Sequence, residues 1–473
     1  MAEEPIVAPR GYRENPDLLP KGPKEKVYRT FTFTFMMFSM NTCIPMFLLG
    51  PIARTLGCDI WQALAGAFMG NLAAVVVMFL NGVVGVKYGI AFPVQLREPF
   101  GFRGAHIPVI LRGICGTMWY GIEVWAGSYA LTMIALYAMG FPPSEIPVLA
   151  CRWLVIAILF YLATLVIVMR YELKGIGWMA NFGGPIMLLY FAWLTWWLAT
   201  NPQFAPNIPK AFEGTTAWWS MPFLIYLAVQ TNWWATVALN ISDLSRGLKT
   251  STQLFIALFL GIVICQIVGT ALGYYAVVLT GVVVPQDIIV QYAPGAVAVI
   301  LGLLFAFLAP WSTDITANAP PLIDILMSVV RLRWKTAVVV AAIIAFFVAP
   351  WWAVEESPQY VNYVTAWASN YGILLGPIAG PMIGNYWIVR KRRYDLQKLY
   401  TYGPEGCWYR GGFSIAGYLA LFLTIALAYV VAYFTNLLSY VGPVPFPGNV
   451  IWYFCVVCSL ILYLIFAKAF KEW

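Results

Sequence analysis

Glu123 is an ionisable residue near the middle of a long apolar stretch, in the run MWYGIEVW from Met118 to Trp125. Trp119 precedes it by one helical turn and lies on the same helix face. An indole offers a surface on which a planar ring stacks, and a carboxylate accepts from the paired N–H donors on the edge of a nitrogen heterocycle. The alternative is a carboxyl group that hydrogen-bonds inside the protein and touches no ligand. We favour the binding site, because ionisable groups at membrane depth are costly and usually functional.

A second group of polar residues lies in the apolar stretch LAPWSTDITANAPP, Leu308 to Pro321. Such side chains cost free energy in a bilayer unless they face protein or a wet cavity. An earlier segment, Phe38 to Phe47, combines Asn41 and Thr42 with Pro45, which removes one helical hydrogen bond. We expect both spans to be broken at these points, as in carriers whose substrates and ions meet unwound backbone. The polar residues of the second group are Ser312, Thr313, Asp314, Thr316 and Asn318.

The segment QTNWWATVALNISDLSRG, Gln230 to Gly247, adds two adjacent indoles, Trp233 and Trp234. Adjacent residues point to different sides of a helix, so we expect at most one of them to stack on a ligand. Asn240, Asp243 and Arg246 follow, and we expect these residues to cap or pin the cytoplasmic end of the helix.

The sequence carries no recognisable reaction apparatus. His106 is the single histidine, and neither an HExxH motif, a phosphate-binding loop nor a Ser/His/Asp set is present. Cys455 and Cys458 form a CxxC within an apolar stretch, where buried helix residues are the better interpretation than a metal or redox site. A repeated channel filter motif is also missing. We therefore expect a carrier and no enzyme, with no organic cofactor.

The composition of the chain indicates that these residues lie on membrane-spanning helices. The chain has 473 residues, of which 61% are hydrophobic and 10% charged. A soluble domain carries about 25% charged residues. Apolar stretches of roughly 20 residues, the length that crosses a bilayer, recur along the chain and predict about 12 spans. The predicted spans are Thr30–Ile52, Trp61–Val86, Ile107–Gly140, Ala150–Met169, Ile176–Thr200, Ala217–Ile241, Thr252–Leu279, Ala296–Val330, Thr336–Pro350, Tyr360–Val389, Phe413–Leu437 and Asn449–Phe466.

Basic residues are sorted by side. With these spans, 25 of the 28 Lys and Arg residues fall in alternate loops and tails, and the other side holds Arg54, Arg152 and Lys210. Because cytoplasmic loops collect Lys and Arg, both termini are predicted to be cytoplasmic in a multi-pass protein of the cell membrane. The net charge of +8 is thus topological and needs no nucleic-acid partner.

The predicted organisation is one membrane domain without a soluble domain. It comprises an amino-terminal tail (1–29), a core of ten helices (30–389), a cytoplasmic loop (390–412) and two further helices with a short tail (413–473). The first hydrophobic stretch is too long for a signal peptide, so we expect it to remain in the protein. Glycines at 372, 376, 380 and 384 favour close packing of another helix, and sliding during gating is the alternative.

Five motifs together resemble the nucleobase-cation symporter family, first subfamily. They occur in that family's order between about Asn15 and Tyr400: GIAFPVQLREPFGFRGAHIPVILR, MWYGIE, WWATVALNISDLSRG, APWSTDITANAPP and LLGPIAGPMIGNYWIVRKRRYDLQKLY. The resemblance implies an all-α membrane protein with the LeuT-type fold, two inverted repeats of five helices plus two more. It also implies import of purines, pyrimidines, allantoin, hydantoins or related vitamins with sodium or protons.

The resemblance also assigns residues. Trp119 and Trp234 match the two indoles that hold the ring in a hydantoin-transporting member, and Asn318 matches its substrate-bonding asparagine. Glu123 and Cys43 each stand where that member has glutamine, which puts hydantoin in doubt. A carboxylate favours a ring N–H beside an exocyclic amine, as in guanine, cytosine or adenine.

The coupling ion has two candidates. The resemblance places sodium between the hydroxyls of Ser312 and Thr313 and the carbonyls of Ser39, Thr42 and Ala309. The alternative for the hydroxyls is bonding to their own helix. A proton carried by Glu123 would be the competing mechanism, because burial favours the protonated carboxyl group. The alternative function is thus a proton-coupled permease for allantoin, hydantoin or a vitamin-like pyrimidine. The partners expected are a small heterocycle and the bilayer, without an obligate protein partner.

Overall fold

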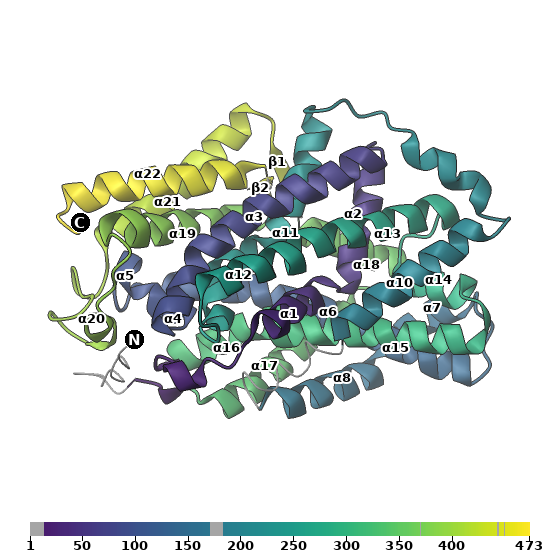
Figure 1. Cartoon of the computed structure of the whole chain (residues 1–473), viewed down its shortest axis with the longest axis horizontal. Helices are drawn as coiled ribbons and strands as arrows, with labels where there is room; N and C mark the ends of the chain where they lie inside the picture. The colour runs from purple at the N-terminus through teal and green to yellow at the C-terminus, as the bar shows by residue number, and fades with distance from the viewer. Residues whose placement is uncertain (1–13, 171–182, 369, 442–443, 449) are drawn as a thin grey trace.

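The computed structural model describes residues 14–170, 183–368, 370–441, 444–448 and 450–473. Helices form nearly all of this part of the chain, as predicted (Figure 1). The first half contains α1 (Thr30–Asn41), α2 (Ile44–Thr55), α3 (Ile60–Tyr88), α4 (Phe92–Gln95), α5 (Arg97–Phe100), α6 (His106–Ala138), α7 (Ile146–Arg152), α8 (Leu154–Met169), α10 (Gly183–Thr200) and α11 (Met221–Ser245).

The second half continues the same pattern. It contains α12 (Ser251–Leu258), α13 (Cys265–Thr280), α14 (Pro285–Tyr292), α15 (Gly295–Thr313), α16 (Ala319–Ser328), α17 (Trp334–Val348), α18 (Ser357–Ala368), α19 (Gly372–Ile383), α20 (Leu396–Tyr400), α21 (Ile415–Phe434) and α22 (Ile451–Ala469). Short 3-10 helices lie at Pro16–Leu18, Pro23–Glu25, Ala205–Phe212 and Pro350–Trp352. An antiparallel hairpin of β1 (Leu438–Val441) and β2 (Val444–Pro447), with Leu438 opposite Pro447, is an addition to the predicted all-α fold.

Among the described residues, seven helices are long and apolar enough to cross a membrane, or nine if each of two bent helix pairs is one span. The other three predicted spans coincide with α6, α10 and α11, of which α6 and α11 carry many buried polar residues. The predicted span Ile176–Thr200 begins outside the described residues. The count of 12 therefore stays a prediction.

One of the two predicted breaks is present. Between α1 and α2 the chain bends by 57°, because Thr42 and Cys43 leave the helical conformation before Pro45 starts the next helix. The prediction for the segment after Pro310 is wrong in form. Residues Gly295–Ser328 make one continuous helix, in which Asp314–Asn318 adopt a π-helical turn between α15 and α16. A π turn inserts an extra residue without unwinding the helix, and such turns are frequent at functional sites.

The segments that connect the long helices lie at two opposite ends of the molecule. The first described residues, the end of α22 and the short helices α4, α5 and α20 lie at one end of the long axis (Figure 1). Helices α7 and α14 lie at the opposite end. This arrangement agrees with the predicted separation of the basic cytoplasmic segments from α7, which ends at Arg152.

Close helix packing accounts for the glycine repeat. Gly376, Gly380 and Gly384 face α22, where added Cβ atoms would meet Cys455, Ser459 and Leu460. The predicted close approach is therefore present, and its partner is the last helix of the chain.

Candidate functional site

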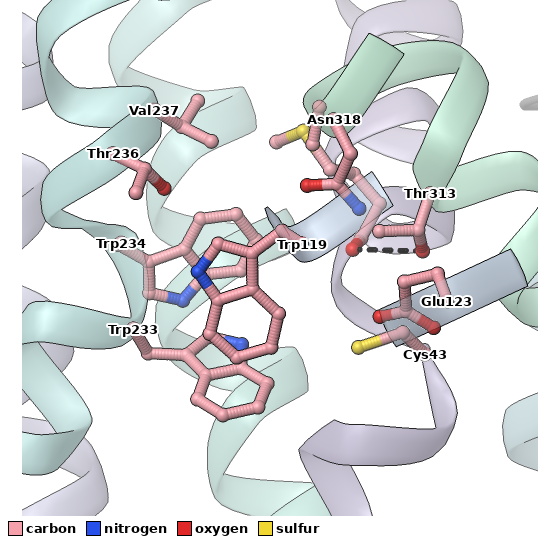
Figure 2. Close-up of a pocket in the computed structure, with 11 residues that line it drawn as sticks. Cys43, Trp119, Glu123, Trp233, Trp234, Thr236, Val237, Thr313 and Asn318 are labelled. Atoms are coloured by element: carbon pink, nitrogen blue, oxygen red, sulfur yellow. Dashed lines mark hydrogen bonds between the residues drawn. The ribbon is translucent and has the colours of Figure 1, made fainter. Parts of the chain in front are cut away.

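A cavity of about 30 Å³ lies between the α1–α2 break, α6, α11 and the π turn (Figure 2). It brings together Cys43, Trp119, Glu123, Trp234 and Asn318, the five residues predicted to contact substrate. The cavity is also lined by Thr313, a predicted sodium ligand, and by Trp233, one of the two adjacent indoles noted in the sequence. Sequence reasoning did not assign the remaining lining residues, because small and apolar side chains on a helix face carry no distinguishing signal. These are Met40, Thr236, Val237 and Ala317.

Glu123 is the acidic side of the cavity. Its side chain is 1% exposed and extends from α6 toward Cys43 (Figure 2). The Cys43 thiol is a hydrogen-bond donor to the Glu123 carboxylate. The other carboxylate oxygen, Oε2, has no hydrogen-bond partner among the described residues. A buried polar atom without a partner costs free energy, which a donor on a ligand would recover.

The aromatic side is formed by three indoles from two helices. Trp119 on α6 meets Trp233 on α11 with ring centroids 4.9 Å apart and an interplanar angle of 65°. Trp234 also lines the cavity (Figure 2), so both adjacent residues of α11 face it. The expectation that at most one of them stacks on a ligand stays a prediction. Trp234 Nε1 has no partner in the described part of the chain and is a donor for a ligand acceptor.

Asn318 is oriented by a neighbour on its own helix. Its side-chain NH2 group donates to Asp314 Oδ1 at 3.0 Å, and the Tyr161 hydroxyl donates to Asp314 Oδ2 at 2.7 Å. Asp314 is fully buried and satisfied by these two donors. The Asp314 carboxylate, which adjoins the predicted cation site, therefore accepts hydrogen bonds from Asn318 and Tyr161.

Oxygen atoms from two helices converge beside the cavity. The Ser39 carbonyl accepts from the hydroxyls of Ser312 at 3.3 Å and Thr313 at 3.4 Å. The same hydroxyls also bond the Ala309 carbonyl, at 2.9 and 3.1 Å. Four of the five predicted sodium ligands thus lie together as hard oxygen donors, the type that sodium prefers. The fifth, Thr42, lies at the same break, where its hydroxyl bonds the Ser39 carbonyl at 3.4 Å.

The match to known proteins decides the family. Residues 20–455 match the family described as permease for cytosine/purines, uracil, thiamine, allantoin. The chain belongs to this permease family. Members are transporters, so this chain is a multi-pass permease and not an enzyme.

Relatives named as permeases agree with this family assignment. The purine-uracil permease NCS1 of Arabidopsis thaliana is 29% identical over 86% of this chain and 69% of its own length. The hydantoin permease of Microbacterium maritypicum is 26% identical over 90% and 86%. The allantoin permease of Bacillus subtilis is 26% identical over 96% and 93%.

Solved structures fix the fold of the permease. Mhp1, a nucleobase-cation-symport-1 family transporter in a closed conformation with bromovinylhydantoin bound, has a TM-score of 0.77 at 24% identity, covering 97% of both chains. A Na⁺-coupled sialic acid symporter has a TM-score of 0.57 at 12% identity, covering 93% of this chain and 89% of its own. The permease therefore has the LeuT-type fold that the family resemblance implied.

Farther along α11 than the cavity, the permease has a cluster of buried polar residues. The sequence analysis identified only some of its members. Asn240, at a non-helical position within α11, donates to Asp243 Oδ2 at 3.0 Å, and Asp243 Oδ1 accepts from the Phe92 N–H at 2.7 Å. Asn240 and Asp243 thus pin this helix end as predicted, whereas Arg246 Nε and Nη1 have no hydrogen-bond partner among the described residues. Arg112 was missed as a partner: its guanidinium bonds Asn240 Oδ1 at 3.1 Å and the Ala317 carbonyl at 3.3 Å, joining α6 and α11 to the π turn. The sequence feature that could have identified Arg112 is its position inside a predicted membrane span, where a charged residue needs a partner.

Proposed function

We propose that this permease imports a small nitrogen heterocycle carrying an exocyclic amine, coupled to sodium, by alternating access. The observation that supports the substrate class is the polarity of the cavity. Glu123 Oε2 lacks a partner among the described residues, and the Asn318 amide turns its NH2 group toward Asp314. Two acceptors therefore remain for a ligand, which suits a ring with two or more N–H donors.

The aromatic residues support a flat ring. We propose that Trp119 and Trp234 hold the ring between them while Glu123, Asn318 and Cys43 contact its edge. Aromatic stacking contributes about 0.5–1.5 kcal/mol beyond burial of area, and the hydrogen bonds then select among rings of similar size. All five side chains are buried, which keeps water from competing for the acceptors.

Sodium coupling is supported by the position of Thr313. Its hydroxyl belongs to the oxygen cluster with Ser39, and its side chain also lines the cavity. A cation bound by Ser39, Thr42, Ala309, Ser312 and Thr313 would hold the α1–α2 break against α15 and so fix one wall of the substrate site. By linkage, sodium and substrate then raise each other's affinity by the same factor.

The proposed setting is the cell membrane with both termini in the cytoplasm. In this proposal, residues 30–389 are the transport core, 1–29 and 390–412 are cytoplasmic, and 413–473 supply two peripheral helices. The basic segments at one end of the molecule support this orientation.

The experiment is thermal stabilisation of the detergent-purified permease by bases, allantoin, hydantoins and vitamin-like pyrimidines, in sodium or in choline. We expect an aminated base to stabilise the protein most, and more strongly in sodium. If stabilisation by the ligand is the same in sodium and choline but changes with pH, the coupling ion is a proton carried by Glu123. Failure of every heterocycle to stabilise the protein would contradict the proposed substrate class.

A further inference from the structure

Trp233 occupies space that a substrate needs. Its side chain lines the cavity, is 8% exposed, and meets Trp119 at a ring-centroid distance of 4.9 Å (Figure 2). The cavity between these walls has a volume of about 30 Å³. A heterocycle that stacks on Trp119 where the Trp233 indole now lies must displace that indole.

The other polar and aromatic walls are held by specific contacts. Glu123 is bonded by Cys43, and Asn318 is bonded by Asp314. Trp119 is flanked by Trp233 and, on another edge, by Tyr371, whose ring centroid lies 6.2 Å away at 85°. Tyr371 is itself fixed, because its hydroxyl donates to the Asn232 carbonyl at 2.7 Å. Displacing Glu123 or Asn318 would break a hydrogen bond, and displacing Trp119 would break its contact with Tyr371.

Trp233 also lies at the end of the cavity that is farther from the buried polar cluster of Asn240 and Asp243. Along α11 it precedes Thr236 and Val237, which line the cavity one turn closer to Asn240 and Asp243. Figure 2 shows Trp233 and Cys43 on one side of the cavity, with Val237 and Asn318 on the other. If a ring is held against Trp234, the Trp233 indole therefore covers the side of the ring that is farther from the buried polar cluster.

We propose that Trp233 is a specificity-determining residue that limits the permease to flat rings bearing only hydrogen, oxo or amino groups. This inference rests on the proposed function and narrows it. When a ring enters, the Trp233 indole leaves its contact with Trp119 and packs over the ring. A substituent larger than an amine would meet this indole among buried side chains, where added volume forces neighbours off their preferred rotamers.

The test is ligand stabilisation of the full-length permease in sodium by matched pairs: adenine with N6-benzyladenine, and hydantoin with 5-benzylhydantoin. We expect wild type to respond to an unsubstituted ring and not to its benzylated partner. Trp233→Ala should strengthen binding of the benzylated ring by roughly tenfold or more, the scale on which a tight apolar pocket discriminates by size. Trp233→Phe should give an intermediate gain.

Controls separate the possible failures. Trp196→Ala removes an indole from α10 that is 62% exposed, and its ligand profile should equal that of wild type. Trp233→Phe preserves a flat aromatic side chain and carries the test if the alanine variant does not fold. Equal responses of wild type to both members of a pair, or rejection of benzylated rings by both Trp233 variants, would overturn this inference alone. A wild type that responds to no ring overturns the proposed function.

Discussion

Asn318 donates its side-chain NH2 group to Asp314 Oδ1 at 3.0 Å, one turn earlier in the same π-helical segment. In this contact the NH2 group of the amide is turned toward Asp314. The Asn318 oxygen is then the atom left for a ligand. Under the proposed function, the specificity of the cavity would thus depend on Asp314, which does not line it.

We predict that Asp314→Asn weakens ligand binding about 5- to 10-fold, because an amide at 314 presents either a donor or an acceptor and Asn318 loses its fixed orientation. The measurement is the concentration dependence of stabilisation by the best ring ligand. Tyr161→Phe is the matched control, since it removes the other hydrogen bond to Asp314 and leaves that of Asn318. Equal losses in both variants would show that Asp314 acts only in folding.

Exchange of the Glu123 carboxylate for an amide should change which rings bind. Hydrogen bonds to charged groups contribute about 1.5–3 kcal/mol. We therefore predict that Glu123→Gln weakens binding of an aminated base roughly 10- to 100-fold and improves the relative response to hydantoin or allantoin. Uptake competition measures the change. If allantoin or hydantoin displaces substrate from wild type better than any aminated base, the proposed role of Glu123 is wrong.

Loss of the Thr313 or Ser312 hydroxyl should uncouple sodium from substrate. We predict that Thr313→Ala and Ser312→Ala remove most of the sodium-dependent part of ligand stabilisation, because each deletes one oxygen of the predicted ligand set. Thr316→Ala is a control on the same helix, since the Thr316 hydroxyl bonds only the helix carbonyls of Ser312 and Thr313 among the described residues. Sodium dependence that survives in both variants would contradict the proposed cation site.

The residues of the cavity were predictable because each is costly at membrane depth unless it has a function. Glu123 and the polar group that ends at Asn318 are recognisable on this ground, and family resemblance assigned Trp119, Trp234, Asn318 and Cys43 to the substrate. The form of the second break was not predictable. Pro310 and the polar residues after it are compatible with an unwound segment or with a π turn, and only the packing of α15 against α6 decides between them.

Long-range partners were also beyond the sequence. Asn41 lies at the break after α1, yet its NH2 group donates to the carbonyls of Gly261 and Ile262, in a π turn between α12 and α13. Arg112 likewise reaches Asn240, 128 positions away. Such contacts depend on how helices are arranged, which periodicity does not specify.

Gly380 gives a stability prediction for the contact between α19 and α22. A Cβ there would lie 2.7 Å from the Val456 carbonyl oxygen, so Gly380→Ala must push the two backbones apart. Overpacking of this kind costs about 1–3 kcal/mol. We expect a lower melting temperature than for Gly22→Ala, where the nearest atom is the flexible Glu25 side chain at 3.6 Å. Equal melting temperatures would show that α22 adjusts without cost.

Asp287 gives a pH prediction at the opposite end of the molecule from the termini. It lies on α14, between two spans, where it is 5% exposed. Its carboxylate accepts from the Tyr129 hydroxyl on α6 at 2.8 Å and the Ser357 hydroxyl on α18 at 2.6 Å. Burial raises the pKa of the Asp287 carboxyl from 3.8 to about 6, against the lowering effect of these two hydrogen bonds. The remaining titratable neighbour on α7 is Cys151.

The sign follows from proton binding. With α14 packed, Asp287 holds a proton more tightly than when α14 lifts and the carboxyl meets water at a pKa of 3.8. The packed state therefore loses stability as pH rises from about 4 to 6, and acidification from pH 7.5 to 5 favours it by roughly tenfold. Hydrogen–deuterium exchange of residues 285–292, corrected for the intrinsic rate, should slow at pH 5. Asp287→Asn should abolish that difference, and slower exchange at pH 7.5 in wild type would contradict the assignment.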